Sequence, residues 1–436
     1  MPHNPFIVYR KPVLANEMTS ASAFLSAIGA SEKEINLISA KKHSQYHLVT
    51  IAKRSSGSRT LSVPNDRLKF LQRKVIEIIY PLYRPRWCVQ GFIKGRSALG
   101  NAQRHVGRNH LVKLDLKDFF DQITSVRVRG VLNYFGVDRI VIETIITLCT
   151  LSGKLPQGAP TSPLLANMVA FSLDQRMLDY AKQNRLKYTR YADDIVLSSF
   201  SKPRILKSSV SADFTKLRSD DLDEKFMNIF NEEGFAINEE KMWYCGPRAS
   251  RTVTGYTINE FVNVPREHIR RIRSILHDIE ARGYPSAQVK FSEKTRSIKS
   301  LKSSLKGRLG WVSATKGLSD PVYRNLAIRY NKIFPLGALE IGPDFTQMSS
   351  MSTWVLEALS LNGHGLPEAQ GTAFFLKGVG LVTAAHCLPN NCEYLVFDVE
   401  HPGVPPLKWS THWDRNILFR RTIRWQASET NRKTSF

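Results

Sequence analysis

Two adjacent aspartates, Asp193 and Asp194, are the residues of this sequence best suited to carry chemistry. They precede the apolar run 195–197, and neighbouring carboxylates beside an apolar run repel each other unless a cation neutralises them. A third carboxylate, Asp115, stands near the end of the alternating segment 111–116. Three such groups can bind two Mg²⁺ ions for an in-line phosphoryl transfer. On spacing alone, a solvated turn is the alternative for the Asp-Asp pair.

The segments around these aspartates have the periodicities of strands and helices. Residues 111–116 alternate as a strand, and 187–199 indicate two short strands joined at the Tyr-Ala-Asp-Asp turn. Between them, 131–151 and 162–183 predict two long helices. The central block is therefore expected to be α+β. Further elements are predicted nearer the N-terminus, with helices at 21–40 and 68–80 and a strand at 47–53.

Five motifs occur in a fixed order along the chain. They are RTLSVP (59–64), LDLKDFF (114–120), LPQGAPTSPLLAN (155–167), YADD (191–194) and GFAINEEKMWY (234–244). In this order they resemble the motifs of reverse transcriptases. The resemblance implies a right-hand polymerase with fingers, palm and thumb. It also implies that Asp115, Asp193 and Asp194 are the catalytic metal ligands for two Mg²⁺ ions. Asp118 and Asp121 are expected to be surface or helix-start carboxylates.

The same resemblance assigns residues to the incoming nucleotide and the template. Phe120 matches an aromatic gate against the 2′ hydroxyl, the group that separates ribonucleotides from deoxynucleotides. A core phenylalanine is the alternative. Gln157 and Gly158 match a loop where bare backbone approaches the template and nucleotide, a role that glycine can fill because it has no Cβ.

Cationic residues are expected to meet the triphosphate. Arg59 is the candidate, since a guanidinium pairs with phosphate bidentately, and Lys53 or Arg54 could take its place. Lys241 is expected either to donate a proton to the departing pyrophosphate or to be a solvated lysine.

Two shorter motifs narrow the resemblance to the bacterial retron reverse transcriptases. Asn101-Ala102-Gln103-Arg104-His105 matches their Asn-Ala-x-x-His motif, and Val253-Thr254-Gly255 matches their Val-Thr-Gly motif. The resemblance implies that Asn101, His105, Val253, Thr254 and Gly255 serve a cognate RNA. For His105, a satisfied helix histidine is the alternative. It also implies that the enzyme copies its own structured non-coding RNA into RNA-linked DNA from a guanosine 2′ hydroxyl.

Residues 265–340 form a basic helical segment, the predicted thumb, with sixteen lysines and arginines against six acidic residues. Lys306 and Arg308 lie beside glycines and Trp311 in the run SLKGRLGW (304–311), and Lys302 lies just before that run. Such groups can bind phosphates and stack on sugars or bases. We therefore expect the thumb to bind nucleic acid.

The C-terminal segments GTAFFL (371–376) and GLVTAAHC (380–387) resemble the first barrel of trypsin-like serine proteases. His386 matches the general base of that family, and Asp414 is a poorly framed candidate for its aspartate partner. No Gly-Asp-Ser-Gly-like segment follows, so no nucleophile can be assigned. The expected element is a protease-like fragment from a truncation or altered reading frame, inert as a protease. A degenerate binding module is the alternative.

Charge and composition agree with a nucleic-acid enzyme. The 436 residues carry 62 Lys and Arg against 38 Asp and Glu, a net charge of +24, which favours a polyanionic partner. Five scattered cysteines match neither a disulfide framework nor a zinc site, and no apolar run could span a membrane. The N-terminus does not have the pattern of an export signal. A cytoplasmic protein without a membrane partner is expected.

The expected domains follow from these segments: N-terminal segment and fingers at 1–110, palm at 111–262, thumb at 263–340, linker at 341–370, and partial trypsin-like domain at 371–436. The expected partners are the cognate RNA with its DNA product, deoxynucleotides, and an effector protein or a second copy in anti-phage defence. The alternative function is a nucleic-acid-binding scaffold or sensor coupled to a protease-type effector.

Overall fold

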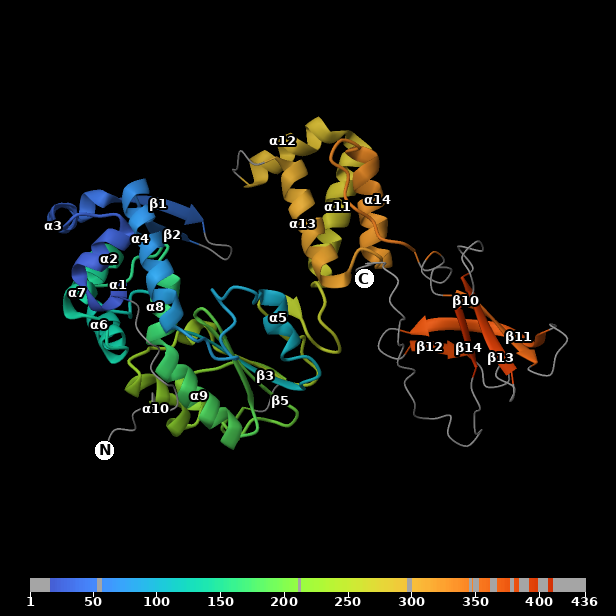
Figure 1. The fold of residues 1–436 in the computed structure, drawn as a ribbon, viewed down its shortest axis with the longest axis horizontal. Helices are drawn as coiled ribbons and strands as arrows, with labels where there is room; N and C mark the ends of the chain where they lie inside the picture. The colour runs from blue at the N-terminus through green and yellow to red at the C-terminus, as the bar shows by residue number, and fades with distance from the viewer. Residues whose placement is uncertain are drawn as a thin grey trace. The chain divides into compact units, whose positions relative to one another are not determined.

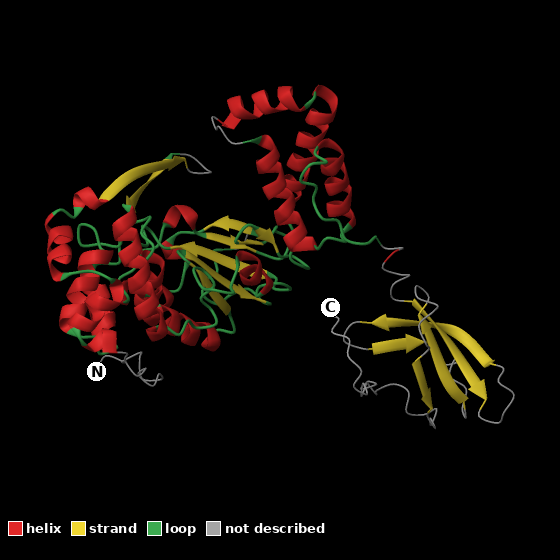
Figure 2. Ribbon diagram, turned by 45° about the horizontal axis from the view of Figure 1, so that its top comes forward, coloured by secondary structure: helices red, strands yellow, loops and turns green. Residues whose placement is uncertain are grey.

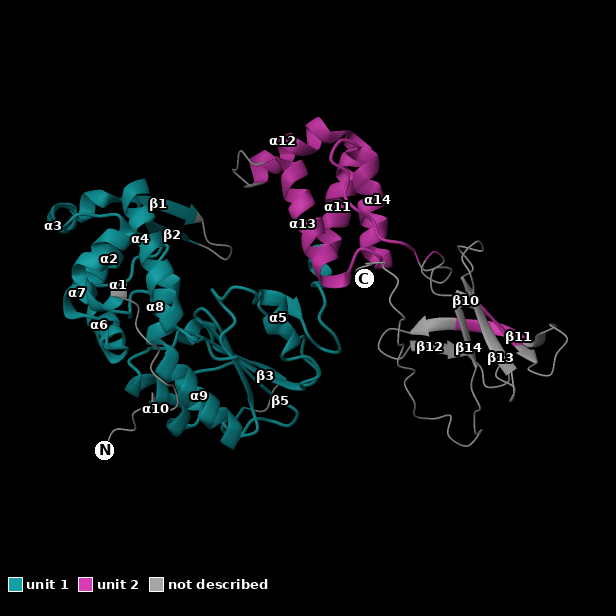
Figure 3. Ribbon diagram, in the orientation of Figure 1, with its two compact units in different colours: residues 1–268 teal, residues 269–436 magenta. Residues whose placement is uncertain are grey.

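The computed structural model describes residues 16–52, 57–210, 213–295, 300–344, 347, 353–360, 367–376, 380–383, 392–398 and 407–410. It divides into two compact units, Met1–His268 and Ile269–Phe436 (Figure 3). The boundary lies close to the predicted start of the thumb at 263. Among the described residues, no helix has both the length and the apolar character needed to cross a membrane.

The N-terminal part of the first unit is mainly helical (Figure 1). It contains α1 (Asn16–Thr19), α2 (Ala21–Ile28), α3 (Glu32–Ala40), α4 (Asp66–Ile79), α5 (Ala98–Gln103) and an antiparallel hairpin of β1 (Tyr46–Ala52) and β2 (Ser58–Pro64). The predicted strand at 47–53 and helix at 68–80 are confirmed within two residues. The single helix predicted at 21–40 is wrong. Gly29, with φ 67°, ends α2, and the Ser31 side chain caps α3.

A five-stranded antiparallel sheet forms the predicted palm (Figure 2). Its strands are β3 (His110–Asp115), β4 (Lys187–Tyr191), β5 (Asp194–Ser199), β6 (Phe214–Lys216) and β7 (Trp243–Cys245), in the order β4-β5-β3-β7-β6. The predicted strands at 111–116 and 187–199 are confirmed. Since β3 lies at the centre of the sheet, its end is fixed by neighbours on both sides.

Helices pack around this sheet. The helices on this side of the unit are α8 (Ser162–Val169), α9 (Phe171–Gln183) and α10 (Glu224–Glu232), whereas α6 (Ser125–Tyr134) and α7 (Arg139–Cys149) contact each other, and α7 also contacts the N-terminal helices α3 and α4. α9 contacts β4 and α10 contacts α9. Each of the two long predicted helices is divided in two. Gly136, with φ 83°, and the Asp138 cap separate α6 from α7, while the chain leaves helical geometry at Ala170 between α8 and α9.

A small hairpin that contains the Val-Thr-Gly motif contacts the helix in which the Asn-Ala-x-x-His motif begins. Strands β8 (Thr252–Val253) and β9 (Tyr256–Thr257) enclose Thr254 and Gly255, both with positive φ, and contact helix α5. The Thr254 hydroxyl donates a hydrogen bond to the Ala98 carbonyl, 2.7 Å away. The Asn-Ala-x-x-His and Val-Thr-Gly motifs are therefore in contact.

The helices of the second unit are α11 (Arg266–Arg282), which begins just before the unit boundary, α12 (Tyr284–Thr295), α13 (Leu301–Lys316) and α14 (Pro321–Ile333). On α11, Ile269, Ile272, Leu276 and Ile279 form a buried stripe at helical spacing. α13 contacts both α12 and α14. The predicted thumb is thus helical, as its sequence pattern indicates.

The C-terminal part differs from its prediction. Strands β10 (Thr353–Ser360), β11 (Pro367–Leu376), β12 (Gly380–Thr383), β13 (Cys392–Asp398) and β14 (Leu407–Ser410) form one antiparallel sheet in the order β12-β11-β10-β13-β14. β10 lies inside the segment predicted as a linker, so that assignment is wrong for 353–360. The described strands do not close into a barrel, and the trypsin-like fragment is not confirmed.

Candidate active site

Strand pairing brings the three predicted aspartates to one end of the palm sheet. In the antiparallel register of β3 and β5, Asp115 lies directly opposite Asp194. Asp193 belongs to the two-residue loop between β4 and β5, and its carbonyl accepts a hydrogen bond from the Leu116 amide at 3.0 Å. This register brings the three residues together, and their role as metal ligands stays a prediction.

A cavity of about 770 Å³ opens at this end of the sheet. Asp115 and Asp193 line it, whereas Asp194 is not among its lining residues. Asp118 and Asp121 also line it, although their sequence context predicts only surface positions, and both are solvent-exposed. The cavity is therefore strongly acidic on its palm side.

The site holds more negative charge than it can easily neutralise. Burial, followed by the charge of Asp115, raises the pKa of Asp193. Partial desolvation and repulsion by Asp193 and Asp115 raise the pKa of Asp194 to about 6. Such crowding favours the binding of a cation.

One protein cation already lies in the site. The Lys241 ammonium is 2.7 Å from Asp115 Oδ2, and the Asn238 amide group is 3.4 Å from Oδ1. Burial alone would lower the pKa of Lys241, but its bond to Asp115 and the nearby carboxylates hold it above its usual value. Lys241 is solvent-exposed but paired with Asp115, and its role as proton donor to the pyrophosphate stays a prediction. It acts as a counter-ion.

Mg²⁺ fits this donor set. Within the described part of the chain, no cluster of three or more His, Cys, Asp or Glu side chains already forms a metal cage. Mg²⁺ seldom needs one, since it is usually held by one or two carboxylates together with substrate phosphates and water. The hard carboxylate oxygens of Asp115 and Asp193, with Lys241 as a stand-in cation, match that requirement.

The crowded charges predict an effect on stability. Asp194→Asn should raise the melting temperature of the metal-free protein, because it removes a carboxylate whose ionisation opposes folding. The unfolded carboxyl titrates near pH 3.9 and the folded one at about 6. The penalty is therefore absent at low pH, grows between these values and is complete above them. Thermal denaturation in EDTA should show stabilisation at neutral pH that disappears toward about pH 4.

Asp179→Asn is the matched control for this measurement. Asp179 is an exposed aspartate on α9, outside the cavity, and should not change the melting temperature. Equal melting temperatures of Asp194→Asn and the unmodified chain at neutral pH would contradict the predicted repulsion.

The predicted nucleotide residues also meet at the cavity. Arg59 on β2, Phe120 and Gln157 line it. The Phe120 ring lies 6.2 Å from the exposed ring of Phe92 and 5.5 Å from that of Phe119. Phe120 is only half-buried, so its assignment as a simple core residue is not supported.

Contacts within the protein already require a glycine at position 158, and its predicted approach to template and nucleotide stays a prediction. Its φ is 119°, and a Cβ there would lie 2.9 Å from the Ser62 carbonyl oxygen. The Ser62 amide donates to the Gln157 carbonyl at 2.7 Å. The close approach that excludes a side chain is thus to strand β2, which fixes the loop beside the cavity.

Phe92 and Lys154 are among the residues that line the cavity and that the sequence motifs did not single out. Phe92 has φ 63°, unusual for a bulky residue, and an exposed aromatic ring; both are features of the structure that the sequence does not indicate. Lys154 adds a second cation beside Arg59. Lys53 and Arg54, the predicted substitutes for Arg59, lie outside the described residues.

His105 is placed inside the protein. Its ring is fully buried, with Nδ1 2.7 Å from the Ser198 hydroxyl and Nε2 2.7 Å from the Thr189 hydroxyl. Burial, followed by nearby cations, lowers its pKa to about 3, so the ring is neutral. The structure corrects the expectation of a direct RNA contact at His105, whose imidazole joins α5 to strands β4 and β5.

The other predicted RNA-binding residues differ in exposure. Asn101 and Val253 are buried, and Asn101 has no side-chain hydrogen-bond partner among the described residues. Thr254 is half-buried, and Gly255 is exposed. Any direct contact of these motifs with RNA is thus restricted to their exposed groups.

In the thumb, the three predicted cations have different settings. The Lys302 ammonium donates to the Leu336 carbonyl at 3.0 Å and lies over the Phe334 ring. Lys306 is exposed, and Arg308 is half-buried. Lys306 is therefore the most accessible of the three for phosphate. The protease-like pair, His386 and Asp414, lies outside the described residues.

Comparison with known proteins identifies the family. The model of the family "Reverse transcriptase (RNA-dependent DNA polymerase)" matches residues 51–258. The retron Ec86 reverse transcriptase of Escherichia coli is 32% identical over 292 residues, which cover 66% of this chain and 81% of that protein. The chain belongs to the retron reverse transcriptases. It is accordingly an RNA-directed DNA polymerase, a class of enzyme that generally uses divalent metal ions.

Two further relatives of this reverse transcriptase come from Myxococcus xanthus. Retron Mx65 reverse transcriptase is 37% identical over 256 residues, covering 54% of this chain and 56% of the relative. Retron Mx162 reverse transcriptase is 30% identical over 315 residues, covering 65% and 63%. The chain thus spans less than two thirds of each of these two relatives. Among solved structures, Candida albicans telomerase has a TM-score of 0.35 at 10% identity, covering 66% of this chain and 63% of that one.

Proposed function

We propose that this chain is the polymerase of a retron, copying its own structured non-coding RNA into RNA-linked single-stranded DNA from a 2′-hydroxyl primer in anti-phage defence. The observation that carries the polymerase assignment is the register that places Asp115 opposite Asp194, with Asp193 in the intervening turn, at the edge of an acidic cavity. Membership of the retron family supports the finer assignments. No described residue favours the alternative of a scaffold coupled to a protease-type effector.

Each part of the cavity has a role in the proposed reaction. A primer hydroxyl oxygen bonds to the α-phosphorus of a deoxynucleotide, the bond to pyrophosphate breaks, and the hydroxyl proton leaves. Two bound Mg²⁺ ions would stabilise the charge that develops on the attacking and leaving oxygens. Asp115 and Asp193 would hold them, with Asp194 as the third carboxylate. Arg59 and Lys154 face the cavity with the charge needed to orient a triphosphate.

We propose that RNA is recognised by a surface whose cations lie near the buried His105 ring. We call it the Trp87–Phe200 surface. It consists of Trp87, Arg104, Arg108, Lys187 and Phe200. Lys187 and Arg104 lie over the Trp87 ring at 4.5 and 5.7 Å, and Arg108 lies over the Phe200 ring at 3.9 Å. Both rings are exposed. Cations beside exposed aromatic rings suit phosphates and unstacked bases.

The test of the proposed function is to sequence the nucleic acid that copurifies with the full chain. A single structured RNA, joined to complementary DNA through a 2′ position, is the expected result. Neutral substitutions at Arg104 and Lys187 should reduce recovery of that RNA while leaving extension of a generic annealed primer unchanged. Recovery of unrelated cellular RNA, with synthesis only on generic primers, would overturn the retron role and leave the polymerase assignment intact.

The thumb is proposed to supply part of the sequence-independent affinity. Lys306→Ala should lower the slope of log K against log salt by roughly 0.7 to 0.9, the value for one lost phosphate contact. The corresponding change at Lys302 should be smaller, because its ammonium is bound to Leu336. Binding to generic RNA at several salt concentrations measures both slopes.

Lys74→Ala is the charge-matched control, since Lys74 lies on α4 and pairs with Glu77 at 2.8 Å. It should leave the slope unchanged. Equal slopes for Lys306→Ala and Lys74→Ala would place the nucleic acid away from this face of α13.

A further inference from the structure

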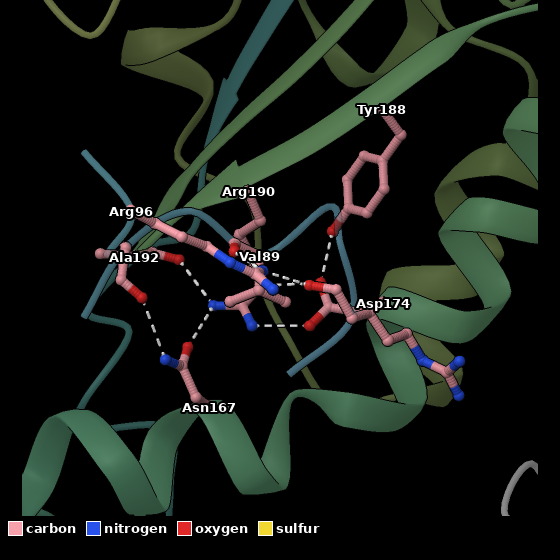
Figure 4. A network of polar contacts seen from close by, with 9 residues as sticks. Val89, Arg96, Asn167, Asp174, Tyr188, Arg190 and Ala192 are labelled. Carbon is pink, nitrogen blue, oxygen red and sulfur yellow. Dashed lines mark hydrogen bonds and ion pairs between the residues drawn. The ribbon is translucent and has the colours of Figure 1, made fainter. Parts of the chain in front are cut away.

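A fully buried guanidinium lies directly behind the catalytic turn. The Arg190 side chain donates hydrogen bonds to residues of two helices and to the turn itself (Figure 4). Its Nε and Nη2 donate to the two Asp174 oxygens on α9 at 2.8 and 2.6 Å, and its Nη1 donates to Asn167 Oδ1 on α8 at 3.0 Å. The same Nη1 donates to the Ala192 carbonyl at 3.0 Å.

The carbonyl that Arg190 holds belongs to a strained residue. Ala192 has φ 59°, a conformation that favours glycine, and it immediately precedes Asp193. An alanine keeps this geometry only where its surroundings enforce it. Since the turn has just two residues between β4 and β5, relaxation at Ala192 would move Asp193.

A second element, the segment 88–91, also packs against the turn. The segment 88–91 runs beside Arg190: the Arg190 amide donates to the Cys88 carbonyl at 2.9 Å, and the Gln90 amide donates to the Arg190 carbonyl at 2.7 Å. A Cβ on Gly91 would lie only 2.5 Å from the Ala192 amide nitrogen. Asn167 Nδ2 donates to the Gly91 carbonyl at 3.1 Å, so the same network fixes this segment.

Stability alone is a weak reason for this arrangement. Two charges taken out of water lose hydration that their mutual attraction only partly restores, so well-packed apolar residues of similar size often do as well. A planar guanidinium, by contrast, can bind a carboxylate bidentately and still direct a further N–H at a chosen carbonyl. The geometry of the guanidinium can therefore fix the position of the Ala192 carbonyl in the turn.

We propose that Arg190 is a positioning residue for DNA synthesis, holding the Ala192 carbonyl so that the strained turn presents Asp193 to the reaction. The proposal rests on the assignment of Asp193 to the active site. Arg190 does not line the cavity, so it acts on the reaction through its neighbours, and the Ala192 carbonyl is the one that lies in the catalytic turn.

Arg190→Lys tests the proposal, because one ammonium cannot reproduce both the bidentate pair with Asp174 and the bond to Ala192. It should reduce kcat by about 10- to 100-fold, the order expected when a reacting group is misplaced by about 1 Å. RNA binding should be retained. Electron paramagnetic resonance should also show weaker Mn²⁺ binding by the variant without any turnover.

Tyr188→Phe is the matched control. The Tyr188 hydroxyl donates to Asp174 Oδ1 at 2.7 Å and is fully buried, so its loss perturbs the same ion pair without touching the turn. It should lower the melting temperature with little effect on kcat. If kcat falls in proportion to the melting temperature, and by the same proportion in Arg190→Lys and Tyr188→Phe, the role of Arg190 is only structural. That result would overturn the proposal.

Rescue gives the sharper result. Ala192→Gly removes the strain that Arg190 is proposed to hold, so it should increase kcat more in the Arg190→Lys background than in the native one. If Arg190→Lys does not fold, Gly91→Ala reaches the turn from the segment 88–91 and should reduce kcat with the Arg190–Asp174 pair intact. Native kcat in folded Arg190→Lys, or in folded Gly91→Ala where the lysine variant does not fold, would overturn the proposal. Inactivity of Asp193→Asn would show that the proposed function still stands.

Discussion

Asp193→Asn is expected to reduce DNA synthesis by about 10³-fold or more, the order seen when a group that stabilises transition-state charge is removed. The amide has nearly the same shape as the carboxylate, so the turn and its bond to Leu116 should persist. Only the negative charge at the cavity is lost. Incorporation of labelled deoxynucleotides on the copurified RNA measures the effect, and binding of that RNA should stay close to native.

Two measurements separate this prediction from general damage. Asp179→Asn makes the same chemical change on the exposed surface of α9 and should retain full synthesis. The melting temperature of Asp193→Asn should not fall in EDTA, because burial and the charge of Asp115 already raise the pKa of Asp193 and disfavour its ionised form. Native rates of synthesis by Asp193→Asn would refute the assignment of the site.

The local parts of this structure could be predicted because they follow from short-range patterns. The alternation in 111–116 and the two short runs around the Tyr-Ala-Asp-Asp turn give β3, β4 and β5 directly, and antiparallel pairing then brings Asp115 opposite Asp194. The helix breaks were missed because a periodic pattern continues across them. Gly29 and Gly136 interrupt helices whose apolar spacing alone indicates no end.

The buried networks could not be predicted, since their members are distant in sequence. His105 bonds to Thr189 and Ser198, residues 84 and 93 positions away, and a motif match gives no information about burial. Arg190 likewise depends on Asn167 and Asp174, which lie on two other elements. The sequence does offer one signal for Arg190, a charged residue inside a strand pattern. Such a residue is rarely fully buried without a charged partner, so the pattern indicates that a partner exists but not which residue it is.

The C-terminal prediction of a trypsin-like fragment is not confirmed, for a related reason. A short match around a histidine indicated one barrel of a two-barrel fold, but such a match does not fix how strands pair. The observed order β12-β11-β10-β13-β14 includes β10, whose sequence lies in the predicted linker. The central strand of the sheet was therefore missing from the sequence-based description.

Phe120→Ala is expected to weaken discrimination between deoxynucleotides and ribonucleotides by about 10²-fold, the order by which a shaped apolar surface can reject one added hydroxyl. The half-buried Phe120 ring lines the same cavity as Asp115 and is supported by Phe92 and Phe119. A nucleotide bound at the aspartates would thus meet this ring. The ratio of kcat/KM for a deoxynucleotide to that for its ribonucleotide, on one annealed primer, measures the change.

Phe120→Tyr is the control, because it keeps an aromatic ring of the same shape at this position. It retains the ring at the cavity and should preserve most of the discrimination, whereas alanine should increase ribonucleotide incorporation with a smaller change in deoxynucleotide use. Because Phe120 is not a metal ligand, both variants should keep the Mg²⁺ dependence of the native enzyme. An unchanged selectivity ratio in Phe120→Ala would mean that the sugar lies away from this wall, and that Phe92, the other exposed ring at the cavity, is the next candidate for the contact.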